Sequence, residues 1–399
     1  MNSRLAERLQ TRLERIQGES RWKDYRVFAS GPDQRIQTAD ARSLLLFTSN
    51  DYLGLARDER VVEAARKATL RYGVGTASAR FICGTTLVHA ALERRLADLC
   101  ATEDALTFNS GWSANLGLLA TLPESGDLIL SDALNHASLI DGARLAAKGV
   151  TRVVFPHADV GAVERELAAW RGPGLAYCVT DGVFSMEGTL APLAELTEVA
   201  RKYGAVMIVD DAHGIGVVGR TGRGCAEAAG VLEQVDIITG SLGKALGGVA
   251  GGFVAAPRSV ISLLQQSARA MLFTTALPAG AAAASCEALG ILRSEPALVE
   301  ELQHKVAAFI DALAANALAP PRTIANSRSA IVPLVIGSSV AARNAAEQLE
   351  RNGIFVSCFS HPVVPEGQAR LRFQISTAHD YEDLAACADA CGKALRADR

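Results

Sequence analysis

The decisive stretch of this sequence reads Val206-Met207-Ile208-Val209-Asp210-Asp211-Ala212-His213. Its apolar residues predict a buried strand, and two acids and a histidine follow that strand directly. A second strand candidate also ends in functional groups, in Asp236-Ile237-Ile238-Thr239-Gly240-Ser241-Leu242-Gly243-Lys244. Because open α/β sheets bind ligands where their parallel strands end, we expect Asp210, His213 and Lys244 to meet at one sheet edge.

Short apolar runs alternate with helix-patterned segments through the body of the chain. Such runs are typical of a largely parallel sheet whose two faces are both covered by helices. Residues 87–100 predict one of these helices, because their leucines fall on one face. The fold class is therefore α/β, with a large, mostly parallel sheet. Its further strand candidates lie at 106–108, 128–130, 153–155, 175–179 and 253–254.

The pattern divides the chain into three parts. Residues 1–47 are expected to form an N-terminal helical arm that docks on the body, because apolar residues recur at helical spacing from Leu5 to Ile16. Residues 48–285 are expected to form the large domain. Residues 286–399 are expected to form a smaller C-terminal α/β domain, with strands near 331–336, 354–358 and 371–375 and a closing helix from about Tyr381.

The composition excludes several classes of protein. Of the 399 residues, 49% are apolar and 21% are charged, which is typical of a globular chain without extensive disorder. The formal net charge of −3 gives no basic field for nucleic acid, and no segment predicts a membrane span. The eight cysteines lack metal-ligand spacing, so we expect free thiols, no metal site and a cytoplasmic protein.

A lysine and an acid at one sheet edge suit a pyridoxal phosphate (PLP) cofactor. PLP needs a lysine for its Schiff base and an acid that keeps the pyridine nitrogen protonated, and Lys244 and Asp210 can fill these roles. Its phosphate binds backbone N–H groups and hydroxyls at glycine-flanked turns. Ser241 suits one side of such a phosphate site, and Gly111-Trp112, after another predicted strand, suits the other.

Other interpretations of the glycines are weaker. Gly214-x-Gly216-x-x-Gly219 matches a dinucleotide fingerprint, but Asp210 to His213 separate it from its strand and the ribose-binding acid is missing. Gly243-Lys244 lacks the upstream glycine and the following Ser or Thr of a P-loop. The turn at Gly111 lacks the last glycine of a nucleophile elbow.

The sequence resembles the α-oxoamine synthases, a branch of the fold-type-I PLP-dependent transferases with an aspartate-aminotransferase-like fold. The match covers nearly the whole chain. It rests on the strings at Ser49–Leu55, Arg80–Thr85, Ser131–Ser138, Thr180–Met186, Val209–Gly214 and Thr239–Lys244. The resemblance implies a homodimer with shared active sites.

The resemblance also implies catalytic roles. Lys244 corresponds to the residue that carries PLP and moves the Cα proton, and Asp210 to the partner of the ring nitrogen. His136 corresponds to the residue that stacks on the ring, and His213 to the one that contacts the 3′-oxygen. Ser185 is implied to lie in the same pocket.

Further positions match groups that bind the phosphate. The backbone of Gly111 and Trp112 and the hydroxyl of Ser241 are implied to bind the phosphate of their own subunit. Thr274 and Thr275 match positions that reach the phosphate of the neighbouring subunit.

The amino-acid substrate has its own matches. Asn50 and Arg372 correspond to the groups that hold its carboxylate, a role that suits the bidentate guanidinium fork. Ser78 is also at a substrate-binding position. Because 5-aminolevulinate synthases have Thr there, that glycine-plus-succinyl activity is a weaker match.

The implied reaction joins glycine or alanine to an acyl-CoA thioester and releases CoA. Phe81–Gly84 and Pro362–Arg370 look closest to glycine C-acetyltransferases, which use acetyl-CoA without decarboxylation. Ala191–Glu195 and the string at Asp210 look more like 8-amino-7-oxononanoate synthases, which use alanine and pimeloyl thioester. Trp112 looks like the residue that autoinducer synthases have at this position. Members of the family that use long acyl-CoA thioesters, including serine palmitoyltransferases, therefore also stay open as alternatives. An aminotransferase is the distant alternative.

Overall fold

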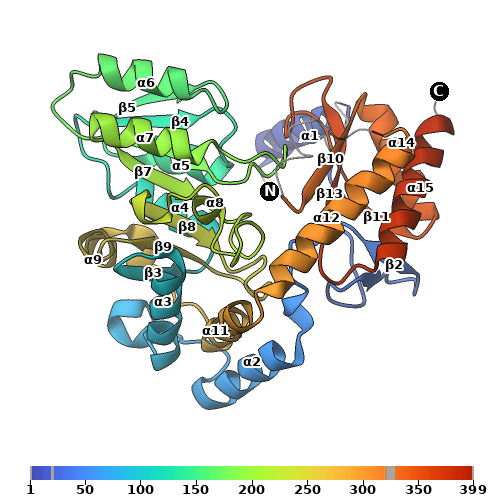
Figure 1. The fold of residues 1–399 in the computed structure, drawn as a ribbon, viewed down its shortest axis with the longest axis horizontal. Coiled ribbons are helices and arrows are strands. Elements are labelled where there is room, and N and C mark those ends of the chain that lie inside the picture. Colours follow the sequence, from blue (N-terminus) through green and yellow to red (C-terminus); the bar gives the residue numbers. More distant parts are fainter. Residues whose placement is uncertain (1, 19–21, 319, 321–328, 398–399) are drawn as a thin grey trace.

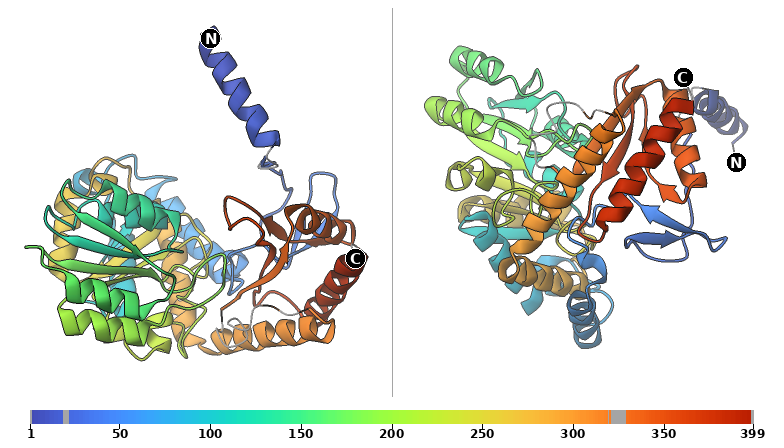
Figure 2. Two further views of the ribbon diagram at one scale, coloured as in Figure 1. Left: turned by 90° about the horizontal axis from the view of Figure 1, so that it is seen from above. Right: turned by 45° about the vertical axis from the view of Figure 1, so that its right-hand side comes forward.

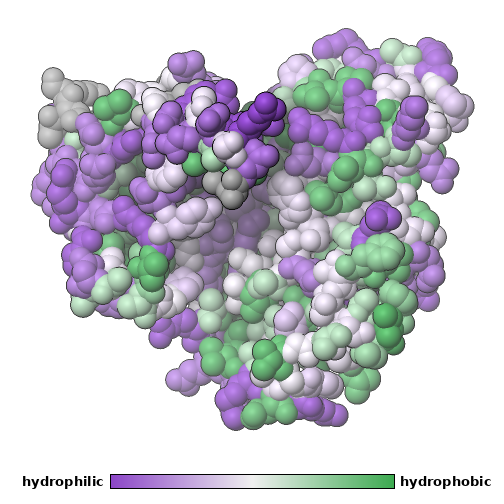
Figure 3. Space-filling view, turned by 180° about the vertical axis from the view of Figure 1, so that it is seen from behind, coloured by the Kyte–Doolittle hydropathy of each residue, from purple (hydrophilic) through white to green (hydrophobic). Residues whose placement is uncertain are grey.

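The computed structural model describes residues 2–18, 22–318, 320 and 329–397. Figure 1 shows a large lobe built around one sheet and a smaller lobe that contains the C-terminal helices. The surface is hollowed between the two lobes when the molecule is seen from behind (Figure 3). The residues expected to carry chemistry come from both lobes.

The large lobe contains a seven-stranded sheet in the order β3-β9-β8-β7-β6-β4-β5. Strand β9 pairs antiparallel with β3 and β8, and the remaining pairings are parallel. Every strand candidate between residues 106 and 254 lies in this sheet, so the predicted fold class is confirmed. The bounds are β3 Asp104–Phe108, β4 Leu128–Asp132, β5 Thr151–Phe155, β6 Ala176–Asp181, β7 Val206–Asp210, β8 Ile237–Ser241 and β9 Gly252–Ala256.

Both faces of the sheet are buried, which explains its uninterrupted apolar runs. Along β7, Met207 and Val209 belong to one buried apolar cluster and Ile208 belongs to another. Successive side chains of a strand point to opposite faces, so each face has its own core. The helices of this lobe are α2 Glu59–Tyr72, α3 Leu87–Cys100, α4 Gly111–Leu119, α5 Ala137–Leu145, α6 Val160–Ala169, α7 Leu193–Tyr203, α8 Cys225–Ala228, α9 Arg258–Ser267, α10 Arg269–Leu272 and α11 Ala279–Ser294.

The smaller lobe has a three-stranded antiparallel sheet in the order β10-β13-β12. Its strands agree with the strand candidates of the C-terminal part. The expected boundary after residue 285 falls inside α11, which packs on α2 and α3, so the change of lobe comes after that helix. The elements are α12 Ala297–Ala315, β10 Ile331–Gly337, α14 Ser339–Arg351, β11 Ile354–Phe355, β12 Ser357–Phe359, β13 Ala369–Gln374 and α15 Tyr381–Ala397.

The N-terminal part differs from the expected helical arm over residues 1–47. Helix α1 (Ser3–Gly18) follows the predicted periodicity, but it has no buried residue and projects away from the body (Figure 2), so the expected docking is not seen in the single chain. Strands β1 (Arg35–Gln37) and β2 (Ser43–Leu46) pair with each other, and β2 pairs with β11. The helix ends where the apolar periodicity ends. Within the described ranges, no helix is long and apolar enough to cross a membrane.

Candidate active site

The carboxyl ends of β6, β7 and β8 bring the predicted catalytic groups together. Asp210, the last residue of β7, lies in register with Asp181 of β6 and Thr239 of β8. Lys244 follows β8 and lies within electrostatic range of both acids. Burial lowers the pKa of its amine below the usual range, although the two carboxylates oppose that shift. A lowered pKa favours the neutral, nucleophilic amine.

Asp210 is fixed by hydrogen-bond donors. It is 7% exposed, and its Oδ1 accepts from the Ala212 N–H at 3.0 Å. Its Oδ2 accepts from Asn115 Nδ2 at 2.6 Å. The two donors hold the carboxylate in one orientation. Asn115 lies on α4 beside the predicted phosphate site, and no local sequence pattern distinguishes it.

His136 caps the helix that follows β4. Its Nδ1 accepts from the Ser138 N–H at 3.3 Å and contacts Ser138 Oγ at 2.7 Å. The backbone N–H of His136 donates to the Asp181 carboxylate at 3.2 Å. Burial lowers the pKa of the imidazole, so the neutral form is favoured. The ring of Trp112 meets the His136 ring edge-on, with 6.1 Å between centroids.

His213 follows β7 and is contacted by a tyrosine from a distant part of the chain. Its Nδ1 lies 2.8 Å from Oη of Tyr52, a fully buried residue. Burial lowers the pKa of His213 well below its usual value, and the basic groups of Lys244 and Arg372 add to that shift. Tyr52 lies within Ser49–Leu55, and no sequence spacing links it to His213.

Gly111 and Ser241, two residues of the predicted phosphate site, lie close together. A Cβ on Gly111 would lie 3.5 Å from the Gly240 carbonyl oxygen and from Ser241 Cβ. A Cβ on Gly252 would lie 2.3 Å from the Gly111 nitrogen, so only glycine lets β9 approach the start of α4 this closely. The result is a turn of N–H groups at a helix N-terminus facing a hydroxyl.

Arg372 of β13 points toward the large lobe. Its Nη1 donates to the Ser185 carbonyl at 2.8 Å and its Nη2 donates to Gln374 Oε1 at 3.3 Å. Its guanidinium stacks over Phe359, with 4.6 Å from Cζ to the ring centroid. Nε is buried without a hydrogen-bond partner among the described residues. Asn50 accepts from Gln374 Nε2, so the two predicted carboxylate ligands share one neighbour.

Ser78, Thr274 and Thr275 lie in a different place. Ala79 and Thr275 form an isolated antiparallel bridge, and the Ser78 carbonyl accepts from the Ala276 N–H at 2.9 Å. No hydrogen bond of the described residues links them to Asn50 or Arg372. They lie beside the π-helix η2 (Arg80–Gly84), on the surface of the large lobe.

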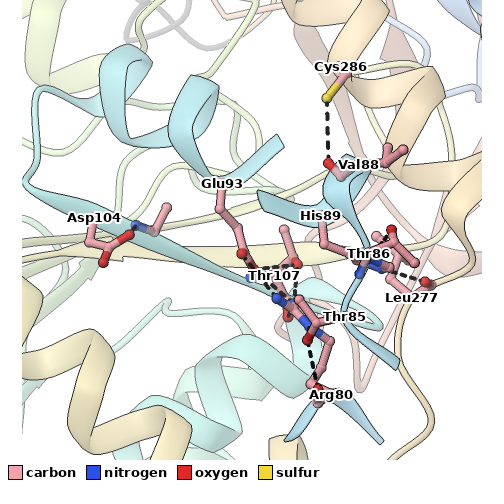
Figure 4. Close-up of polar contacts among 11 residues, drawn as sticks. Arg80, Thr85, Thr86, Val88, His89, Glu93, Asp104, Thr107, Leu277 and Cys286 are labelled. Atoms are coloured by element: carbon pink, nitrogen blue, oxygen red, sulfur yellow. Dashed lines mark hydrogen bonds and ion pairs between the residues drawn. The ribbon is translucent and has the colours of Figure 1, made fainter. Parts of the chain in front are cut away.

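A buried ion pair anchors η2 to the large lobe (Figure 4). Arg80 donates to both carboxylate oxygens of Glu93, at 2.8 and 3.0 Å, and to Thr107 Oγ1 at 2.8 Å. His89 Nε2 lies 2.7 Å from the Leu277 carbonyl oxygen. Both contacts hold the surface segments that carry Ser78 and Thr275 firmly on α3 and β3.

The geometry has a counterpart in known proteins. The family described as aminotransferase class I and II matches residues 42–390. The chain belongs to this family. It is 40% identical to the mitochondrial 2-amino-3-ketobutyrate coenzyme A ligase of Bos taurus, over 96% of this chain and 90% of the relative. It is 42% identical to the 8-amino-7-oxononanoate synthase of Geobacter sulfurreducens, over 93% of this chain and 94% of that relative.

A solved structure of similar fold belongs to a related kind of enzyme. The serine palmitoyltransferase of Sphingomonas wittichii has a TM-score of 0.89 at 28% identity, over 99% of this chain and 97% of that chain. The family, the relatives and this neighbour confirm the expected α-oxoamine synthase branch and the fold-type-I transferase fold.

The residues of this α-oxoamine synthase fit a PLP group. A fixed carboxylate, a buried amine and a helix N-terminus facing a hydroxyl supply the partners that its ring nitrogen, aldehyde and phosphate need. The buried Nε of Arg372 provides a donor for a further anion. Sequence reasoning missed Asn115, Tyr52 and Gln374, which contact the predicted residues from distant segments.

Proposed function

We propose that this α-oxoamine synthase holds PLP on Lys244 and joins a small amino acid to an acyl-CoA thioester, releasing CoA. The observation that carries the proposal is the convergence of Lys244, Asp210 and the incompletely paired guanidinium of Arg372 at one sheet edge. The chain is a C-acyltransferase, and its cofactor is PLP, which solved serine palmitoyltransferases of the same fold contain.

The cofactor would be held by residues of several strand ends. Asp210 would pair with the ring nitrogen, His136 would lie against the ring, and His213 would contact the 3′-oxygen. The N–H groups of Gly111 and Trp112 and the Ser241 hydroxyl would bind the phosphate. When bound, PLP supplies an electron sink that stabilises the charge left on Cα after a proton leaves.

Lys244 is suited to move that proton. Burial lowers its pKa, which favours the neutral amine, and Asp210 and Asp181 lie close enough to stabilise the ammonium formed on proton uptake. The new bond joins Cα to the acyl carbonyl carbon, the thioester C–S bond breaks, and CoA leaves as the thiol.

Arg372 and Asn50 would orient the amino acid. A carboxylate can accept from the free Nε and a neighbouring N–H of Arg372, in the fork geometry that this side chain prefers. Ser185 would lie in the same pocket, which is supported by the hydrogen bond that its carbonyl accepts from Arg372.

Glycine and acetyl-CoA are the substrates that we favour, since relatives at 40% identity over nearly the whole chain are 2-amino-3-ketobutyrate coenzyme A ligases. The decarboxylating condensation of alanine with a pimeloyl thioester is the second candidate, favoured by the 42% identical 8-amino-7-oxononanoate synthase.

A homodimer would give Ser78, Thr274 and Thr275 a role. These residues would serve the active site of the partner subunit, the threonines at its phosphate. Large apolar side chains are exposed beside them, including Phe81, Ile82 and Phe273 at 66%, 68% and 74%. Apolar side chains also gather over the lower part of the molecule in Figure 3. We also propose that the protein works in the cytoplasm.

Product analysis decides between the two substrate pairs. Purified protein with PLP would be given glycine and acetyl-CoA, or alanine and pimeloyl-CoA, and the free thiol and CO2 would be measured. We expect thiol release without CO2 from the first pair. Thiol release with an equal amount of CO2 from the second pair alone would select the alternative. Absence of thiol release from either pair and from longer acyl-CoAs, with glycine, alanine or serine, would contradict the proposed function.

A further inference from the structure

A chain of buried hydrogen bonds leads from Arg372 to His213 through Gln374 and Tyr52. Gln374 is 1% exposed and Tyr52 is 0% exposed. Arg372 Nη2 lies 3.3 Å from Gln374 Oε1, Gln374 Nε2 lies 3.3 Å from Tyr52 Oη, and Tyr52 Oη lies 2.8 Å from His213 Nδ1. The chain connects β13 in the small lobe to the end of β7 in the large lobe.

The direction of the first two bonds follows from the guanidinium. Arginine has N–H donors and no acceptor, so Gln374 must turn its oxygen toward Arg372. The amide nitrogen then faces the other way, where it donates to Asn50 Oδ1 and to Tyr52 Oη. A flipped amide would place two donors against each other at Arg372. Gln374 therefore has one allowed orientation.

The direction of the last bond follows from the single proton of Tyr52. Its Oη accepts from Gln374, and two further atoms lie within reach of its proton, His213 Nδ1 at 2.8 Å and Asn50 Oδ1 at 3.4 Å. The shorter contact has the length of a good hydrogen bond, and the Asn50 oxygen already accepts from Gln374. The two lengths therefore favour a hydroxyl proton directed at His213 Nδ1.

We propose that Gln374 and Tyr52 are positioning residues that hold His213 as the tautomer with a bare Nδ1 and a proton on Nε2. The inference rests on the proposed function for its consequence: a fixed Nε2–H is a donor, the group needed to bind an oxygen of the cofactor. Burial raises the pKa of Tyr52 to about 12, so its hydroxyl keeps the proton that it donates. The pKa of His213 is lowered well below its usual value by burial, so the ring has a single N–H to place.

Gln374 has a second effect in this arrangement. Its oxygen orients Arg372 and its nitrogen orients Asn50, the two residues proposed to bind the substrate carboxylate. The orientation of this one amide therefore determines how both Arg372 and Asn50 are placed. Substitution of Gln374 should disturb amino-acid binding and the His213 tautomer together, whereas substitution of Tyr52 should disturb the tautomer alone.

The tautomer can be measured by 15N NMR on histidine-labelled protein, with and without PLP, and His213 assigned through His213→Gln. We expect an unprotonated Nδ1 and a protonated Nε2 in the wild type, including the cofactor-free protein. In cofactor-free Tyr52→Phe, loss of the donor should give a mixture of tautomers. Tyr177→Phe, which removes another buried hydroxyl, should leave His213 unchanged. A protonated Nδ1 in the cofactor-free wild type would overturn the inference.

Gln374→Glu provides an independent variant, because it keeps an acceptor for Arg372 and replaces the donor with an acceptor. Tyr52 then has a competing partner for its proton, and the His213 signals should change as in Tyr52→Phe. The amino-acid Kd, followed by cofactor absorption, should rise at least about tenfold, because the new carboxylate occupies Arg372. Unchanged His213 signals in both variants would also overturn the inference. The cofactor-free spectra do not depend on PLP chemistry, so their outcome is separate from that of the proposed function.

Discussion

Asn115 on α4 donates a 2.6 Å hydrogen bond from Nδ2 to Oδ2 of Asp210, and this contact joins the helix of the proposed phosphate site to the acid at the end of β7. The Asn115 amide is itself oriented by Thr239, whose hydroxyl donates to Oδ1 at 2.7 Å. The carboxylate therefore has a fixed position and a fixed donor before any ligand arrives. Loss of the Asn115 amide should therefore disturb the position of the Asp210 carboxylate.

Asn115→Ala should weaken cofactor binding in a folded protein. Loss of a hydrogen bond to an ionised group costs about 1.5–3 kcal/mol, and the carboxylate loses the donor that fixes its position, so the Kd for PLP should rise at least about tenfold. Absorption or fluorescence titration with PLP measures this. Asn316→Ala removes a comparable amide donor to Asp389, at 2.7 Å in the smaller lobe, and should leave the Kd unchanged. Equal Kd values for both variants would show that the Asp210 contact has no role in cofactor binding.

Arg372→Gln should leave cofactor binding intact and weaken the amino acid. The substitution removes the positive charge and the unpaired Nε, so the amino-acid Kd should rise roughly 30-fold or more, equivalent to ~2 kcal/mol for charged hydrogen bonds. The shift in cofactor absorption on adding glycine or alanine reports this Kd. Arg351→Gln on the surface of α14 is the control. Wild-type amino-acid affinity in Arg372→Gln would remove this residue from the substrate site.

Asp211→Asn should change how stability depends on pH. Asp211 is 1% exposed, its Oδ2 accepts from the Cys225 N–H at 2.7 Å, and burial raises its pKa to about 6. Between pH ~4 and ~6 the folded state binds more protons at this site than the unfolded state, so the carboxyl makes stability fall as pH rises. At pH 7 the accumulated cost is about 3 kcal/mol.

Urea unfolding at pH 5 and pH 7 tests this sign. Asparagine keeps an acceptor for Cys225 without the charge, so the stability of Asp211→Asn relative to the wild type should increase by about 1 kcal/mol between the two pH values. If the two proteins respond equally to pH, Asp211 does not titrate in this window.

Gly224→Ala should destabilise the protein far more than Gly230→Ala. Gly230 has φ +73°, a left-handed conformation that costs an alanine about 1 kcal/mol, whereas Gly224 has φ +95° and ψ −165°, a region essentially limited to glycine. A Cβ on Gly224 would also lie 1.9 Å from Asp211 Oδ2, whereas a Cβ on Gly230 meets nothing within 4 Å. We expect a loss of several kcal/mol for Gly224→Ala and about 1 kcal/mol for Gly230→Ala in urea unfolding. Equal losses would mean that the Asp211 carboxylate moves aside at little cost.

The fold was predictable wherever the sequence carried local patterns. Strand β7 is apolar on both faces, so it had to lie inside a covered sheet, and the polar residues after it had to lie at the sheet edge. The antiparallel direction of β9 and the pairing of β2 with β11 depend on long-range contacts, which periodicity does not record. For the same reason the expected helical arm gave way to strands after Gly18.

The site was predictable for residues that follow strands. Asp210, His213, Ser241 and Lys244 owe their meeting to strand order alone. Asn115, Tyr52 and Gln374 were missed because their partners are distant in sequence: Gln374 lies 324 residues from Asn50, whose oxygen it binds. A buried amide in a strand or helix has no distinctive spacing, so only the three-dimensional contact identifies it.

The central claim is that Lys244 carries the cofactor, and borohydride reduction tests it most directly. Purified protein with PLP would be reduced, digested and analysed by mass spectrometry, with Lys244→Ala treated in parallel. We predict a pyridoxyl group on Lys244 in the wild type. The wild type should also show visible absorption from the bound cofactor, and the absorption spectrum of Lys244→Ala with PLP should differ from it. A colourless wild-type protein after PLP addition, or a pyridoxyl group on another lysine, would contradict the account.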